Sequence, residues 1–423
     1  MGLLGVGKAR RAFGGLPPQA RLMAEFLACA EQPDRVSSTV TRVWPALWGR
    51  LSQLGGPPDP WDLLPVLRKA RLVVYVKLGE SADLLVGFRM DPLVAAAIQQ
   101  EASEQVRLAV AGELGRLWAL SAEQARQVPD GEDSRQVVGA ALSAAPYLLR
   151  AALWEEASVM LENVVNREPS PHVLESVITM YKQVVAATGS ARHQAILARA
   201  LANRAGTDAA AGLAESESLY RDAIARFVAD GDHRRAFGAL AELAVRFGSA
   251  GRLAEALDLM GQADSHAQQA DLGPWTRVSP RVQRLALLSR SGEHARVLAE
   301  IAELEAIMAE LPAQRAENDM VNPWNLRETV LGAGLTAALV QGNARQALEF
   351  SGELIAALRS RNAGRYEIAR TRIYDVGSLA ELGRRAEAEE VLRYCLQAFE
   401  EHGDAAMAQQ ARTVLADLQH RPR

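Results

Sequence analysis

The sequence predicts an all-α chain built from repeated pairs of helices, preceded by a small domain that contains one β-hairpin. Three observations favour this fold class. Alanine and leucine are abundant and only 5% of the 423 residues are aromatic, a composition that favours helices over sheets. Apolar residues recur at helical spacing along most of the chain. From about residue 134 onward a self-similar pattern repeats, without a convincing strand pattern.

Charge and cysteine content limit the classes of partner and compartment. A net charge of -4 gives no general attraction to nucleic acid or to an anionic membrane. Cys29 and Cys395 lie far apart inside helical patterns, so we interpret them as small buried apolar residues in a reducing compartment. No apolar run reaches the length of about 18 residues that spans a bilayer, and no signal-peptide core follows Met1. We therefore expect a soluble cytoplasmic protein without membrane contact.

The opening stretch MGLLGVGKARR raises the question of phosphate binding. Gly2, Gly7 and Lys8 match the G-x4-G-K core of a phosphate-binding loop. Such a loop joins a buried strand to a helix N-terminus and carries a hydroxyl group that binds Mg²⁺. We expect no strand before this stretch, because the sequence starts at Met1, and Ala9 stands in place of the hydroxyl residue. We expect residues 1–15 to be a flexible basic leader; a nucleotide-binding protein that uses these glycines is a less favoured alternative.

Residues 16–100 carry the pattern of a small mixed domain. Helical stretches, one of them interrupted by Pro45, lead to the β-branched runs RLVVYVKL and DLLVGFRM. Gly79 to Ala82 separate these runs, which predicts a β-hairpin. Asp91 is expected to cap a long following helix, with Pro92 in its first turn. Helices followed by a two-stranded wing and another helix predict a winged-helix-like domain.

We expect residues 101–133 to form a connecting helix and a linker, and residues 134–423 to form the repeat array. In the clearest copy, Gly251 makes a turn between two antiparallel helices, and the small side chains of Ala244 and Ala256 let the backbones approach closely. The stretches WTRVSPRV and LPAQRAENDMVNPWN are expected to be loops within the array. The same turn-and-pack spacing recurs at Gly342 and Ala347, at Gly383 and Ala388, and, more weakly, at Gly292 and Val297.

These copies resemble the tetratricopeptide repeat from roughly Ser134 to Leu418, with a period of about 40 residues in place of about 34. The resemblance implies a superhelix whose groove, lined by the first helix of each pair, binds a protein or peptide. Arginine, serine and threonine beside apolar residues suit an extended peptide or an acidic chain terminus. The register of the glycine turns gives these candidate groove residues: Ser279, Arg290, Thr329, Thr336, Arg370 and Ile373.

The region from Leu16 to Gln100, above all FRMDPLV at its end, resembles the winged-helix domain of STAND-class signalling ATPases. In that family the domain follows a nucleotide-binding core and often precedes tetratricopeptide repeats. Family members usually have Met-His-Pro after the hairpin, where the histidine senses the nucleotide; Met90 and Pro92 match, but Asp91 replaces the histidine. A carboxylate would repel a phosphate. The resemblance implies the regulatory half of such a protein, in bacterial signalling or defence, with an ATPase or effector enzyme as a partner.

Other sites find no support in the sequence. The segment PWDLLPVLRKA nearest the wing has only Arg68 and Lys69 as cations, which argues against nucleic acid as a partner. The seven histidines and two cysteines show no metal-ligand spacing, and no nucleophile motif or acid–base pair stands out. The sequence therefore predicts a protein that is not an enzyme and holds no cofactor or metal: a scaffold or ligand-sensing arm. The alternative is a DNA-binding transcriptional regulator that uses the winged helix, with the repeats sensing an effector.

Overall fold

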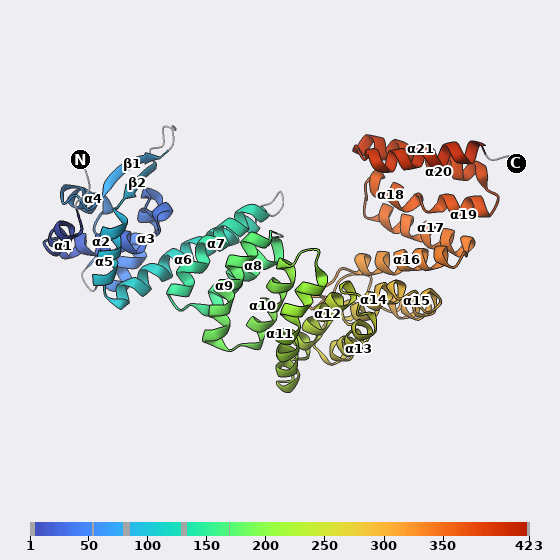
Figure 1. Cartoon of the computed structure of the whole chain (residues 1–423), viewed down its shortest axis with the longest axis horizontal. Helices are drawn as coiled ribbons and strands as arrows, with labels where there is room; N and C mark the ends of the chain where they lie inside the picture. The colour runs from blue at the N-terminus through green and yellow to red at the C-terminus, as the bar shows by residue number, and fades with distance from the viewer. Residues whose placement is uncertain (1–4, 53–54, 79–84, 128–132, 169, 421–423) are drawn as a thin grey trace. The chain divides into compact units, whose positions relative to one another are not determined.

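The computed structural model describes residues 5–52, 55–78, 85–127, 133–168 and 170–420. These residues form helices joined by turns and loops, together with one two-stranded antiparallel sheet (Figure 1). This confirms the predicted all-α fold class with one β-hairpin. The chain divides into two compact units, residues 1–208 and residues 209–423. None of the helices in the described ranges is long and apolar enough to cross a membrane.

The first unit begins with a module, residues 5–101, that we call the N-terminal module. Its centre holds large buried side chains, including Phe26, Trp44 and Phe88. The module consists of α1 (Val6–Gly14), α2 (Pro18–Cys29), α3 (Ser37–Leu51), α4 (Pro60–Lys69), β1 (Val74–Leu78), β2 (Leu85–Arg89) and α5 (Pro92–Glu101). The unit continues with α6 (Glu104–Arg126), α7 (Ser134–Arg150), α8 (Trp154–Arg167), α9 (Pro171–Thr188) and α10 (Ala191–Arg204).

Residues 1–15 were expected to be a flexible leader, but the described part of this segment is mostly helical. Residues 6–14 form helix α1, and its Ala9 and Phe13 are buried in the core of the N-terminal module. The two apolar side chains, four residues apart, lie on one face of the helix and pack against the module. Gly7 and Lys8 lie within this helix, so they do not form a phosphate-binding loop. Gly2 lies outside the described residues.

The expected hairpin and helix cap are present. Strands β1 and β2 pair antiparallel, with Val74 opposite Arg89, and the expected turn lies outside the described residues. The Asp91 carboxylate accepts hydrogen bonds from the backbone N–H groups of Leu93 and Val94, which confirms its role as the N-cap of α5. The long helix expected after it is instead two helices. Extended backbone at Ala102 ends α5, and the Ser103 hydroxyl caps α6.

The expected connecting helix is α6, and residues 128–132 of the expected linker lie outside the described residues. A Cβ atom added at Gly115 of α6 would lie 2.6 Å from the Leu148 side chain of α7, so the two helices are in close contact. The Asp34 carboxylate of the N-terminal module accepts hydrogen bonds from the Trp118 indole N–H of α6 (3.0 Å) and the Tyr147 hydroxyl of α7 (2.5 Å). Helices α6 and α7 therefore join the N-terminal module to the first repeats through buried polar contacts.

The second unit is a series of helical hairpins. In the four turns predicted from the glycine spacing, the glycine has a φ of 70° to 80° and the following N–H bonds to the carbonyl five residues earlier, as at Arg252 N and Phe247 O (2.9 Å). The unit comprises α11 (Ala209–Ala229), α12 (His233–Ser249), α13 (Leu253–Gln269), α14 (Pro274–Arg290), α15 (His294–Ala309), α16 (Pro323–Val340), α17 (Ala344–Ser360), α18 (Arg365–Arg372), α19 (Asp375–Glu381), α20 (Arg385–His402) and α21 (Ala405–His420).

One of the two loops expected inside the array is a helix. WTRVSPRV lies within α14, which continues through Pro280. Proline lacks an N–H group, so the Thr276 carbonyl four residues earlier loses its helical partner. The Ser279 hydroxyl donates a hydrogen bond to this carbonyl (2.8 Å) and replaces the missing one. The second expected loop is present between α15 and α16, where the buried Asp319 carboxylate accepts from the Thr276 N–H and hydroxyl and so ties the loop to α14.

Candidate functional site

Ser279, the first predicted groove residue, is not on an open surface. Its side chain is only 1% exposed, and its hydroxyl is used to repair helix α14 at Pro280. The prediction assigned it to the groove from the register of the turns alone. Its role is structural, because a buried hydroxyl already bonded to its own helix is not accessible to a ligand.

The structure does not bring the remaining predicted groove residues into one site. Thr329 and Thr336 are exposed on α16, and each hydroxyl donates to a carbonyl of its own helix. Thr336 lines a cavity of about 460 Å³, beside Val340 and Tyr374. The other three do not line this cavity. Arg290 is exposed at the end of α14, Arg370 is exposed on α18, and Ile373 is half-buried against the C-terminal hydrophobic cluster.

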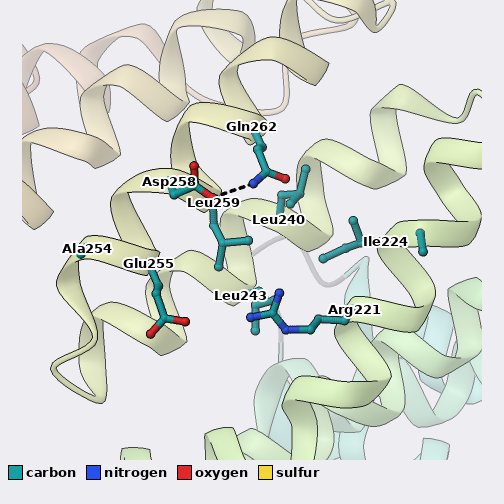
Figure 2. Close-up of a pocket in the computed structure, with 10 residues that line it drawn as sticks. Arg221, Ile224, Leu240, Leu243, Ala254, Glu255, Asp258, Leu259 and Gln262 are labelled. Carbon is teal, nitrogen blue, oxygen red and sulfur yellow. Dashed lines mark hydrogen bonds between the residues drawn. The ribbon is translucent and has the colours of Figure 1, made fainter.

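A cavity of about 560 Å³ lies between α11, α12 and α13, and we call it the α11–α13 pocket (Figure 2). Leu240 and Leu243 of α12 form its floor, together with Ile224 of α11 and Leu259 of α13. The two α12 leucines are fully buried because they also fill the core of the hairpin. The polar part of the lining is Arg221 on α11 and Glu255, Asp258 and Gln262 on α13.

An ionic network holds one side of this pocket. The Glu217 carboxylate accepts from the Arg221 guanidinium (2.8 Å) and the Arg252 guanidinium (2.8 Å), and Arg252 also donates to Glu255. Burial alone would raise the pKa of Glu217, but the hydrogen bonds from both arginines outweigh it and lower the pKa. The hydrogen bond from Arg252 likewise lowers the pKa of Glu255. Arg252 lies 4.0 Å above the ring of Phe247, which fixes the network to α12.

Asp258 differs from Glu217 and Glu255 in its hydrogen-bond partner, which is an amide and not an arginine. Its carboxylate accepts a hydrogen bond from the Gln262 side-chain amide (2.8 Å), as Figure 2 shows. Within the described ranges we find no cation paired with Asp258, whereas Glu217 and Glu255 each have an arginine. The pocket therefore presents an apolar floor beside one negative charge that protein cations do not neutralise.

The two cysteines do not offer reactive thiols at neutral pH. Burial raises the pKa of Cys29 to about 11 and that of Cys395 to about 12, so both thiols are protonated at neutral pH. Among the residues that the structure covers, no group of three or more His, Cys, Asp or Glu side chains could hold a metal ion. The Arg68 guanidinium of α4 lies 5.1 Å from the Tyr75 ring centroid.

The pocket residues were missed because the prediction considered only the first helix of each pair. Glu255, Asp258 and Gln262 follow one another at intervals of three and four residues, which places them on one face of α13. That polar stripe is visible in the sequence. Its position beside apolar residues of α11 is not, because it depends on how three helices pack.

Comparison with known proteins shows a likeness in fold alone. No protein-family model matches the chain, and no curated protein matches it in sequence. The crystal structure of a STAND protein with a tetratricopeptide repeat sensor from Pyrococcus horikoshii aligns over 95% of this chain, with 12% identity and a TM-score of 0.50. The alignment covers 54% of that protein, so this chain spans about half its length.

A second solved structure, of tetratricopeptide-like repeats from a putative kinesin light chain of Podosopora anserina, covers 51% of this chain and 96% of its own. Its identity is 16% and its TM-score 0.39, too low to support an argument. The likeness to the Pyrococcus protein places the fold of this chain among tetratricopeptide-type helical repeats. The resemblance of the N-terminal module to a winged helix stays a prediction.

Proposed function

We propose that this chain is a non-catalytic binding arm that recognises a protein or peptide segment in the α11–α13 pocket. The segment would place an apolar side chain on the floor and a lysine or arginine beside Asp258. The observation that carries this proposal is a cavity of about 560 Å³ with an apolar floor and one acidic group without a cationic partner among the described residues. Its volume lies within the usual range of ligand-binding clefts.

The charge arrangement favours a cationic over an anionic ligand. Arg221 and Arg252 already bind carboxylates of the protein, so an acidic ligand would have to displace Glu217 or Glu255. A cation at Asp258 adds an attractive interaction and has no arginine to displace among the described residues. Opposite charges placed in this way also set the register of a bound segment.

The fold likeness supports a wider proposal, that the chain is the sensor arm of a STAND-type signalling system with an ATPase or effector enzyme as its partner. The relative covers nearly the whole chain, and its own repeats are described as a sensor. Asp91 is used as the cap of helix α5, so we do not propose that this residue senses a nucleotide. Binding at the repeats would be passed on through neighbouring helices, as in other repeat arrays.

A peptide selection on the whole chain tests the binding proposal. Random peptides displayed on phage are selected against the wild-type protein, and the affinities of the enriched peptides are measured by isothermal titration calorimetry. We expect enriched peptides to share an apolar residue next to a lysine or arginine. Asp258→Lys should weaken their binding at least about tenfold, because it replaces an attraction by a repulsion.

Asp222→Lys is the matched control, because Asp222 is exposed on α11 and does not line the pocket. It makes the same change in net charge and should leave affinity within about twofold of wild type. Selection of peptides without the apolar and cationic pair, equal loss in both variants, or failure to select any peptide would contradict the proposal.

A further inference from the structure

Two histidines meet at the open end of the hairpin formed by α12 and α13. His233 is the first residue of α12 and His266 lies in the last turn of α13. Because the helices run antiparallel, these two ends lie together. The Nδ1 atoms of the two rings are 2.9 Å apart, and the ring planes are inclined by only 26°.

Both rings are half-buried, and their Nδ1 atoms face each other. In the protein alone, one of these nitrogens must carry a proton and the other a lone pair for the hydrogen bond to form. Neutral imidazole is the form that binds metal ions.

We propose that His233 and His266 form a two-imidazole site for a divalent transition-metal ion, with Cu²⁺ bound more tightly than Zn²⁺. Metal–imidazole bonds are about 2.0–2.1 Å long. Two nitrogens bound to one metal ion therefore lie about 2.9 Å apart when the N–metal–N angle is a right angle, and about 3.3 Å apart when it is tetrahedral. The observed 2.9 Å is the length of the hydrogen bond between the two rings, and it is also the spacing that two ligands at a right angle require, so the rings have to turn but not to move apart to bind one ion. Copper also stands highest in the general order of divalent metal affinity.

The remaining coordination positions are left to water or to an exogenous ligand. The nearby Asp232 carboxylate is held by the Arg235 side chain and backbone N–H, and no third ligand is found within the described parts of the chain. Both imidazoles bind the metal through Nδ1 and carry their proton on Nε2, so the proton of the original hydrogen bond moves to Nε2 through solvent. The neutral pair therefore releases no net proton on binding.

A metal ion here would join the first turn of α12 to the last turn of α13. Binding to the folded state alone raises its stability, so the melting temperature should rise with metal concentration. Helices α12 and α13 also line the α11–α13 pocket, so the same ion would fix two of the three pocket helices relative to each other.

Copper titration of the full chain without an affinity tag tests this proposal. CuSO₄ is added to chelator-treated protein, binding is followed by calorimetry, and the coordinating atoms are identified by electron paramagnetic resonance. We expect one Cu²⁺ per chain with two nitrogen ligands and a raised Tm, weaker binding of ZnCl₂ and none of MgCl₂. His233→Ala and His266→Ala should each weaken Cu²⁺ binding at least about tenfold, since each removes half of the protein ligands.

His294→Ala is the matched control, because His294 begins α15 as His233 begins α12. It should leave the affinity unchanged. If either alanine variant is unfolded by circular dichroism, His233→Asn and His266→Asn replace them, since asparagine retains a hydrogen-bonding side chain. Wild-type affinity in a folded variant, a spectrum without two nitrogen ligands, or an equal loss in His294→Ala would overturn the proposal.

Discussion

The N-terminal module and the hairpins of the second unit are both helical, but they are specified in different ways. The module is built around large side chains such as Trp44 and Phe88, which contact partners distant in the sequence. The hairpins are built around small residues at fixed distances from a turn, such as Ala256 after Gly251. The fold of the module therefore depends on contacts that are each found at one place in the sequence. The fold of the hairpins depends on a short spacing, a turn glycine followed by a small buried residue, that is repeated along the chain.

One turn in the first unit sharpens this comparison. Between α7 and α8, Ala152 takes a φ of 56°, and the Leu153 N–H bonds to the Leu148 carbonyl (2.9 Å). This is the same backbone arrangement as at the glycine turns of the second unit. The packing of the two helices therefore imposes the left-handed turn even where the residue is not glycine.

The largest effect is expected from a charged side chain at a hairpin crossing. Ala256 is fully buried, and Ala256→Arg should lower the free energy of unfolding by about 3 kcal/mol or more, because the crossing has no room for a long cation. Urea denaturation followed by circular dichroism measures the change. Ala254→Arg, at an exposed position on the same helix, should stay within about 0.5 kcal/mol. Equal stability of the Ala256 variant and wild type would show that the hairpin register is wrong.

The next effect concerns the polar contacts that join the N-terminal module to α6 and α7. Asp34→Ala should lower the free energy of unfolding by about 2–4 kcal/mol, because the Trp118 N–H and the Tyr147 hydroxyl lose their buried acceptor. The same denaturation experiment measures it. Asp62→Ala, an exposed change in α4, serves as the control. A loss below about 0.5 kcal/mol for Asp34→Ala would mean that these contacts contribute little.

Features that depend on neighbouring residues could be predicted from the sequence. The glycine turns, the cap at Asp91 and the two strands of the hairpin are of this kind, because each is set within a few residues. The first half of helix α14 was expected to be a loop; Pro280 lies in this half, and only the geometry shows that the Ser279 hydroxyl replaces the hydrogen bond lost there. The α11–α13 pocket was missed because only the first helix of each pair was considered, and because the pocket exists only where three helices meet.

A pH series compares two buried tyrosines. Burial raises the pKa of Tyr147 in the module contact and of Tyr181 in the first repeats. Because the pKa is raised, each tyrosine stays protonated in the folded state at pH values where it ionises in the unfolded state. The free energy of unfolding is therefore unaffected below the ordinary tyrosine pKa of about 10, and above it falls by about 1.4 kcal/mol per pH unit for each tyrosine. Unfolding curves between pH 9 and 11 should show this loss, and Tyr147→Phe should reduce its slope. An unchanged slope would show that Tyr147 ionises freely in the folded protein.

The smallest effects are expected at the turns, and they have opposite signs. Ala152→Gly should raise the free energy of unfolding by about 0.5 kcal/mol. Glycine removes the strain of the left-handed backbone, and this gain exceeds the loss that comes from the higher entropy of glycine in the unfolded chain. Gly251→Ala should lower it by about 1 kcal/mol, since alanine takes on that strain at a φ of 80°. Thermal melting of the two variants beside wild type measures both. Changes of the same sign would contradict the shared turn geometry.

The central claim, that the α11–α13 pocket binds a partner segment, is tested most directly by amide hydrogen exchange of the full chain with and without a selected peptide. The account predicts slower exchange in α11, α12 and α13 on binding, and loss of this protection at the same peptide concentration in Asp258→Lys. Protection confined to the cavity at Thr336 and Tyr374, or to the N-terminal module, would contradict it.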